Sequence, residues 1–454
     1  MISAVAGHLL QCSSSLMEIR FHRPTSATDS HALAMSAMST TRSDPSRAHL
    51  AGAQPMPFKQ KLIAAISLWL AGVGLRLTVL AIPPVITLIK DDLHLSATQV
   101  GILTGLPVSL FALAAVVGSL LAARAGASSA LLIGLLVTAA ASALRSASGE
   151  VGLLYSATVF MSLGVAIMQP ALPLLVRTWL PGRIAFGTAV YSNGLLIGEI
   201  LPVAVTPLLL PFVGTSWRIS IMLWSLPVLV IAAWIWLTAP KNGPQVPLLQ
   251  KWWPNWRSGL VWKLGLMFGC ITSMYFTVNG FLPVYLHTIG RDDLIDSALL
   301  ALNLGQLPAS FLLLFTASRL VMHAWPYFCG ALGAFASIAL LIFSTGISTT
   351  LASAVLGFCC GAILILALAL PPLLCPPQDV APTSAAIFTL SYGCAVVVPV
   401  ASGLVWDWTG FPASAFLPIG SCALLLLALA RTIRFSPNTA QSTLHGPQSK
   451  SAGA

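Results

Sequence analysis

Charged side chains are scarce in this sequence. Asp, Glu, Lys and Arg together make up 7% of the 454 residues, whereas hydrophobic residues make up 57%. A soluble domain carries about 25% charged residues, so this composition excludes an ordinary water-soluble fold. The mean hydropathy of +0.89 agrees. The sequence therefore predicts an integral membrane protein whose partner is the lipid bilayer.

The signatures of common enzyme classes are also missing. The chain has no Gly-x-x-x-x-Gly-Lys phosphate loop, no HExxH and no Gly-x-Ser-x-Gly motif. Seven of the eight cysteines fall inside or at the ends of apolar segments, without the spacing of metal ligands. They are interpreted as small buried hydrophobic residues rather than as a redox or zinc site. No enzymatic activity, cofactor or metal is expected.

Apolar runs of about 20 residues predict membrane-spanning helices. The expected spans are 62–89, 98–122, 128–147, 151–176, 184–211, 218–237, 262–286, 298–318, 324–346, 350–374, 383–406 and 412–432. The predicted fold class is an all-α integral membrane protein with twelve transmembrane helices in two six-helix repeats. Because each repeat has an even number of helices, the two repeats have the same orientation, as in transporters with parallel repeats.

Several short segments recur at a fixed offset of 201 positions, which supports a duplication. Lys90-Asp91-Asp92-Leu93 returns as Arg291-Asp292-Asp293-Leu294, and Leu106-Pro107-Val108-Ser109 returns as Leu307-Pro308-Ala309-Ser310. Weaker matches follow in the same order and close to the same offset. Pro107 and Pro308 thus occupy equivalent points, where a proline permits a bend. They are candidate symmetric hinges, and a purely structural role is the alternative.

The distribution of charge predicts the orientation. Most of the 22 Lys and Arg residues fall in the tails or in loops on the same side as both termini, while Lys90, Arg145, Arg218 and Arg291 fall on the other side. This is the positive-inside pattern of a multi-pass protein of the cell membrane, inner or plasma, with both termini cytoplasmic. The net charge of +10 then reflects topology, and no nucleic-acid partner is expected. A monomer is expected.

The expected domain division follows from the same pattern. Residues 1–57 form a disordered N-terminal tail with Met56 as an alternative start, residues 58–238 the first six-helix bundle, and residues 239–261 a cytoplasmic linker. Residues 262–434 form the second bundle and residues 435–454 a disordered C-terminal tail.

Arg76 lies near the middle of the first apolar segment. A charged residue at the bilayer centre costs about 2.5 to 3.5 kcal/mol on insertion scales, so it needs a partner. Its planar guanidinium suits an anionic or carbonyl-bearing substrate. A structural ion pair or a side chain that extends to the membrane surface is the alternative.

Local motifs narrow the class of protein. They are Thr104-Gly105-Leu106-Pro107, Ile167-Met168-Gln169 followed by Pro173, Phe281-Leu282-Pro283 and Leu302-Asn303-Leu304-Gly305-Gln306. With twelve helices in two parallel repeats, the chain resembles the major facilitator superfamily, and within it the cyanate permease and nitroimidazole transporter family. The resemblance covers about residues 62–432.

The sequence departs from this family at two points. The superfamily loop between helices two and three usually carries an Asp-Arg pair and further cations, whereas this chain keeps Gly118 and Gly126 but has Ala and Ser in place of the charges. The usual inside gate is therefore weakened or built otherwise. The family's Asn-Leu-Arg-Pro in the first helix is here Gly-Leu-Arg-Leu, so that only Arg76 is retained.

Glu199 is the one acid within the expected spans that is far from a helix end. Helices one and five are neighbours in the fold that the chain resembles, so a pair between Glu199 and Arg76 is plausible. Burial favours the neutral acid and Arg76 favours the carboxylate, which permits a protonation switch. A proton-coupling role and a purely structural pair are both open. Ser192, Glu199 and Thr206 recur every seven residues and are expected to face the cavity as one stripe.

Further polar residues lie at a similar depth. The resemblance places them on helices that line the transport path, which suits substrate binding, and hydrogen bonds between helices are the alternative. They are Gln169, Tyr275, Asn279, Asn303, Gln306 and Tyr392.

The predicted function is secondary active transport of a small anion or small polar organic solute by alternating access, with possible proton coupling as a symporter. The alternatives are a drug or metabolite efflux carrier, a non-transporting membrane sensor of the same fold, or an intramembrane enzyme. The expected partner is a small-molecule substrate.

Overall fold

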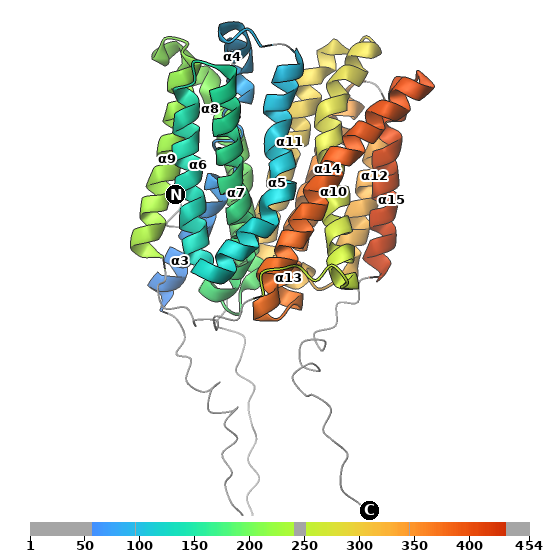
Figure 1. Cartoon of the computed structure of the whole chain (residues 1–454). Helices are drawn as coiled ribbons and strands as arrows, with labels where there is room; N and C mark the ends of the chain where they lie inside the picture. Colours follow the sequence, from blue (N-terminus) through green and yellow to red (C-terminus); the bar gives the residue numbers. More distant parts are fainter. Residues whose placement is uncertain (1–56, 96, 240–250, 345, 433–454) are drawn as a thin grey trace, which may run out of the picture. The chain divides into compact units, whose positions relative to one another are not determined.

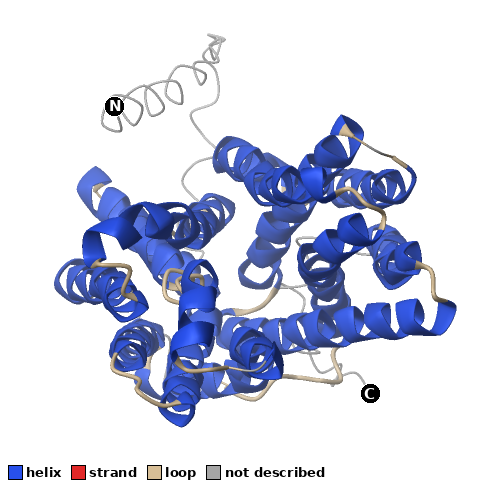
Figure 2. Cartoon of the chain, turned by 90° about the horizontal axis from the view of Figure 1, so that it is seen from above, coloured by secondary structure: helices blue, strands red, loops and turns tan. Residues whose placement is uncertain are grey.

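The computed structural model describes residues 57–95, 97–239, 251–344 and 346–432. These residues belong to one unit, Met56–Ala454. Within the described ranges every regular element is a helix, and Figure 2 shows no strand in them. The expected tails 1–57 and 435–454, apart from residue 57, and most of the linker 239–261 lie outside the described residues.

The helices divide between two halves of the sequence (Figure 1). The first half holds α3 (Phe58–Gly74), α4 (Ile86–Asp92), α5 (Ala97–Ala125), α6 (Ala127–Ser146), α7 (Val151–Trp179), α8 (Ile184–Leu209) and α9 (Trp217–Thr238). The second half holds α10 (Gly259–Thr288), α11 (Ile295–Leu320), α12 (Ala324–Phe343), α13 (Ile347–Leu374), α14 (Val380–Thr409) and α15 (Leu417–Thr432). Short 3₁₀ turns join several of them.

Eleven helical segments of the described residues are long and apolar enough to cross a membrane. The expected all-α membrane fold is confirmed, and these segments match eleven of the expected spans. The last of them begins as a 3₁₀ turn, Pro412–Phe416, before α15.

The first expected span, 62–89, is wrong as a single helix. It consists of α3, an interruption over Leu75–Ile82 and the short α4. Pro83 and Pro84 have no N–H group, so the carbonyls of Val79 and Leu80, four residues earlier, lose their helical donors. This loss favours an interruption before α4, whereas α13 continues through its own proline pair, Pro371 and Pro372. Arg76 therefore lies just after the end of a helix rather than in the middle of one.

The packing of helices repeats between the halves. In the first half α3 packs on α8, α5 on α7, and α6 on α9; in the second half the corresponding pairs are α10 with α14, α11 with α13, and α12 with α15. The halves meet where α5 packs on α14 and α8 on α11. Pro107 lies inside α5 and Pro308 inside α11, at equivalent places in this scheme.

Two ends of the bundle are distinguished by their loops. The linker end holds Lys251–Ser258, between the end of α9 and the start of α10, and the far end holds α4 and the turn Arg291–Leu294. Helices α7 and α13 both end at the linker end, and α4 lies at the top of Figure 1.

Glycines bring α3 and α8 into backbone contact. A Cβ atom on Gly194 would lie 2.1 Å from the carbonyl oxygen of Trp69, and one on Gly198 would lie 2.4 Å from that of Val73. The spacing Gly-x-x-x-Gly is the arrangement that lets two helices in a membrane approach closely. Glu199 directly follows Gly198 in α8. The close approach of the two helices therefore places Glu199 near the end of α3, where Arg76 lies.

Candidate functional site

A cavity of about 60 Å³ lies between the two halves. A single water needs at least about 10 to 15 Å³ of such volume, so the space suits a solute of a few heavy atoms. Its lining is mainly apolar, with a few polar groups that converge on it. The polar and aromatic lining residues are Arg76, Gln169, Tyr191, Glu199, Phe268, Thr272, Tyr275, Phe276, Gln306, Phe388 and Tyr392.

Arg76 and Glu199 form an ion pair in this cavity. The Arg76 Nε lies 3.2 Å from Glu199 Oε1, and the two side chains are 11% and 18% exposed. The expected pairing is therefore present. Arg76 Nη2 also donates to the hydroxyl of Tyr392 at 2.9 Å, and its guanidinium carbon lies 5.6 Å from the ring centre of Phe111. Since neither bond uses Nη1, that nitrogen makes no hydrogen bond within the described residues and is available to a ligand.

Tyr392 links the two halves. It accepts from Arg76 of the first half, and Gln169 Nε2 of α7 lies 3.4 Å from the same hydroxyl. Gln169 is buried, and its Oε1 has no hydrogen-bond partner in the described part of the chain. A buried amide with one unpaired end is costly unless a ligand or water completes it. This end of Gln169 is a polar group that a solute could satisfy.

The second half contributes two polar residues that line the cavity and two asparagines that lie behind them. Tyr275 and Gln306 line the cavity, whereas Asn279 and Asn303 do not. Tyr275 donates its hydroxyl proton to Asn303 Oδ1, and Asn303 Nδ2 donates to Asn279 Oδ1 at 3.1 Å. The two asparagines thus orient Tyr275 from behind rather than face the cavity. For these two, the structure supports the interhelical alternative.

The expected stripe on helix five is partly wrong. The lining residues of α8 are Tyr191, Leu195, Leu196 and Glu199, with a spacing of three to four rather than seven. Thr206 instead accepts a hydrogen bond from Trp224 Nε1 of α9 at 2.8 Å. A spacing of seven follows a helix face only approximately, and Thr206 lies two turns beyond Glu199, beside α9.

The phenylalanines of the site were not anticipated from the sequence, although Tyr275 and Tyr392 were. Phe268 and Phe388 form an edge-to-face pair with ring centres 5.7 Å apart, and Phe388 stacks on Tyr392 at 6.2 Å. Such residues are common in any buried helix, so composition alone does not mark them. The one available signal was that Phe388 lies four residues before Tyr392, on the same face of α14.

Contacts at the linker end join the two halves, directly through Arg177 and indirectly through residues of the linker. Arg177 of α7 donates from Nη1 to the carbonyl oxygens of Pro372, at 3.1 Å, and Cys375 at the end of α13. Lys251 Nζ lies 3.5 Å from Asp379 Oδ1. The hydroxyl of Ser119 on α5 donates to the carbonyl of Trp252 at 2.9 Å. These contacts lie beside the loop that lacks the superfamily's usual charges.

Comparison with known proteins identifies the class of this membrane protein. Residues 65–399 match the sequence model of the Major Facilitator Superfamily. The chain belongs to this superfamily, and it is a multi-pass, non-enzymatic membrane transporter.

Three relatives are transporters by name, and the names of two of them support the narrower resemblance. The "Uncharacterized transporter YycB" of Bacillus subtilis (strain 168) is 25% identical over 74% of this chain and 84% of its own length. The 2-nitroimidazole transporter of Escherichia coli (strain K12) is 28% identical over 52% of this chain and 60% of its own length. The cyanate transport protein CynX of the same strain is 25% identical over 54% of this chain and 64% of its own length. The chain thus aligns with less than two thirds of the last two.

Solved structures share the fold. The human organic anion transporter MFSD10 aligns with a TM-score of 0.68 at 12% identity, covering 83% of this chain and 100% of its own. FucP in the outward conformation aligns with a TM-score of 0.66 at 14% identity, covering 82% and 99%. At these identities the likeness shows the fold alone.

Proposed function

We propose that the chain is a secondary active transporter of a small anion or small polar organic solute. The two bundles, residues 58–238 and 262–434, would rock about the central cavity and expose it to each side in turn. The observation that carries this proposal is the cavity between the halves, in which one buried cation, Arg76, pairs with one partly buried acid, Glu199. Ionisable residues inside a membrane bundle are expensive and mark substrate or ion paths.

The geometry favours a small anion as the substrate. The Nη1 of Arg76 has no partner among the described side chains, and Tyr275, Gln306 and Gln169 surround the same space. Glu199 would release Arg76 when it takes a proton, which frees more donors for the anion and couples transport to protons. Cyanate, which the name of one relative gives as its substrate, has the size and charge that this site suits.

A second candidate substrate is a neutral heteroaromatic solute, moved by uptake or efflux. Phe268, Phe276 and Phe388 line the cavity, and flat rings pack well against aromatic side chains. The relative named as a 2-nitroimidazole transporter has a substrate of this kind. Transport of a neutral ring would need Arg76 less than transport of an anion does.

Thermal stability of the purified protein tests both candidates. A ligand that binds only the folded state stabilises it by about 2.7 kcal/mol at one hundred times its dissociation constant, so the melting temperature rises. We expect cyanate or another small anion to raise the melting temperature of the wild type but not of Arg76→Ala. A shift with 2-nitroimidazole in both proteins would favour the second candidate. Stabilisation by organic cations alone would contradict both.

We also propose that the linker end faces the cytoplasm. A cysteine at Ser297, which is exposed near the far end, should then react with a membrane-impermeant thiol reagent added outside intact cells. A cysteine at Asn255, exposed in the linker, should react only after the cells are opened. Cys12 of the N-terminal tail and the exposed Cys329 are replaced by serine in both variants. The opposite labelling pattern would reverse the proposed orientation.

A further inference from the structure

The first helix of the first half is interrupted, and its counterpart in the second half is not. Helix α10 runs unbroken from Gly259 to Thr288, although Pro283 lies inside it. In the first half the chain leaves α3 after Gly74 and resumes as α4 at Ile86. Arg76 lies in this interruption, so the direction of its side chain depends on what holds the non-helical segment Leu75–Ile82.

Arg145 of α6 holds this segment directly. Its Nη1 donates to the carbonyl oxygen of Thr78 at 3.0 Å, two residues beyond Arg76. The side chain is in the last turn of α6, and the residue is only 1% exposed. In the described ranges no carboxylate lies within ion-pair distance of Arg145.

A buried arginine without a carboxylate needs a reason. Its burial is costly unless its donors are used, and within the described residues its Nε has no hydrogen-bond partner, so the contact of Nη1 weighs more. Removing a partner from a buried charge is more costly than removing one from a neutral group. Here the partner is a carbonyl that the interruption leaves outside a regular helix. The proline pair at Pro83 and Pro84 prevents the chain from satisfying the neighbouring carbonyls in the usual helical way.

The repeat supports a specific role for this contact. Helix α12, the counterpart of α6, also has 20 residues, and its last residue but one, the place that Arg145 has in α6, is Ile342. The half with the interrupted helix therefore has the buried arginine, and the half with the continuous helix lacks it.

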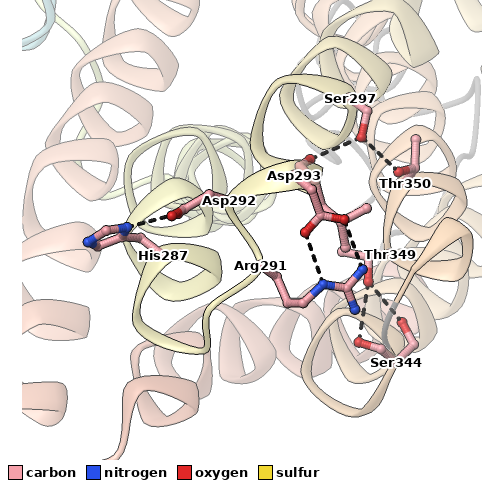
Figure 3. Close-up of polar contacts among 9 residues, drawn as sticks. His287, Arg291, Asp292, Asp293, Ser297, Ser344, Thr349 and Thr350 are labelled. Carbon is pink, nitrogen blue, oxygen red and sulfur yellow. Dashed lines mark hydrogen bonds and ion pairs between the residues drawn. The ribbon is translucent and has the colours of Figure 1, made fainter.

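Arg218 makes a second contact to the same interrupted helix, nearer the surface. Its Nη1 lies 2.8 Å from Asp92 Oδ2 at the end of α4, and its Nη2 donates to the carbonyl of Ser148 at 3.0 Å. The equivalent of Asp92 is Asp293, which pairs with Arg291 of its own turn instead (Figure 3). Among the ion pairs of the described residues, none links this end of α10 to a neighbouring helix.

We propose that Arg145 is a positioning residue for the central site. It fixes the interrupted segment through Thr78 and thereby sets the place of Arg76 beside Glu199 and Tyr392, although it does not itself line the cavity. The importance of this placement for transport rests on the proposed function. The placement itself is a property of the empty protein, so it is tested without a substrate.

Hydrogen exchange of the purified protein followed by mass spectrometry measures this directly. In Arg145→Met the amides of the segment 75–82 should exchange about ten- to a hundredfold faster, since a hydrogen bond to a charged donor is lost. Arg145→Lys keeps one charged donor and should restore most of the protection. Arg218→Met is the matched control, and its faster exchange should be confined to residues 86–95. Unchanged exchange over 75–82 in Arg145→Met, or an equal increase in every helix, would overturn the proposal.

A double-mutant cycle then tests whether Arg145 acts through Arg76. If it does, Arg145→Met should lower the melting temperature less in an Arg76→Met background than in the wild type, because the positioned side chain is already gone. Arg218→Met should have the same effect in both backgrounds. Additive effects for Arg145 and Arg76 would mean that Arg145 stabilises the bundle independently, which would overturn the positioning role. If no solute binds the wild type, that outcome would count against the proposed function. It would not affect the hydrogen-exchange result or the double-mutant result, because neither needs a substrate.

Discussion

Arg76→Ala is expected to abolish the binding of anionic solutes. The substitution removes the one cation that lines the cavity, together with its bonds to Glu199 and Tyr392. Arg76→Lys should restore binding only in part, because an ammonium group lacks the planar fork with which a guanidinium contacts two acceptors at once. Binding is measured by the ligand-induced shift of the melting temperature. Wild-type affinity for an anion in Arg76→Ala would contradict the proposed role.

Glu199→Gln is expected to separate binding from coupling. The amide resembles the protonated acid, so binding and solute exchange should persist while net uptake no longer follows a proton gradient. Counterflow and proton-driven uptake in reconstituted vesicles measure the two activities. Proton-driven uptake that survives in Glu199→Gln would remove Glu199 from the coupling mechanism.

A purely structural ion pair predicts a different outcome for the same variants. Each single substitution would leave one buried charge unpaired, which costs about 3 to 5 kcal/mol for a fully buried pair and less for this partly exposed one. The double neutral variant, Arg76→Met with Glu199→Gln, would then recover stability. Transport in that variant would keep the wild-type dependence on pH. The combination of stability and uptake for the two singles and the double distinguishes the two roles.

The sequence revealed those parts of the site that carry charge in an apolar surrounding. Arg76 and Glu199 were identifiable because a charge in an apolar segment needs a partner. The repeat placed Pro107 and Pro308 at equivalent points, and the structure has them in the equivalent helices α5 and α11. The distance between Arg76 and Glu199 depends on the glycines of α8, which allow α3 to approach closely. This role follows from the packing of the two helices and could not be predicted from the sequence of α8 alone.

Other features depend on contacts that no local pattern encodes. The pair Pro83-Pro84 signals an interruption, but the apolar run across it has the length and composition of a single span. Arg145 lies near the end of the expected span 128–147 and therefore resembles an ordinary cation at the membrane surface, whereas the structure buries it against Thr78. The contact of Arg177 with the end of α13 joins residues 195 positions apart, and its acceptors are backbone atoms.

Arg177→Ala is expected to open the linker end. The carbonyl of Pro372 cannot accept from the residue four positions later, because that residue is Pro376, and the last carbonyls of a helix have no partners within it. The guanidinium supplies the missing donor from the other half and meets the negative end of the helix dipole. The loop beside this contact lacks the charges that the superfamily usually has there. The closed state of the linker end should therefore depend strongly on Arg177.

The expected size follows from the bond type. Hydrogen bonds to charged groups contribute about 1.5 to 3 kcal/mol each, so the loss of even one should shift the ratio of open to closed forms about ten- to a hundredfold. Spin labels at Ala125 and Gln378, which are both exposed at this end on opposite halves, report the opening as a longer distance by double electron–electron resonance.

Arg183→Ala is the matched control for this variant. Arg183 carries the same charge, is exposed and directly precedes α8 at the same end. Among the hydrogen bonds of the described residues, only its backbone takes part, with Leu180 and Gly187. Its loss should leave the label distance as in the wild type and change transport little. Arg177→Ala should slow transport by favouring the form open at the linker end. An unchanged distance distribution in Arg177→Ala would show that the remaining contacts, Lys251 with Asp379 and Ser119 with Trp252, close this end without it.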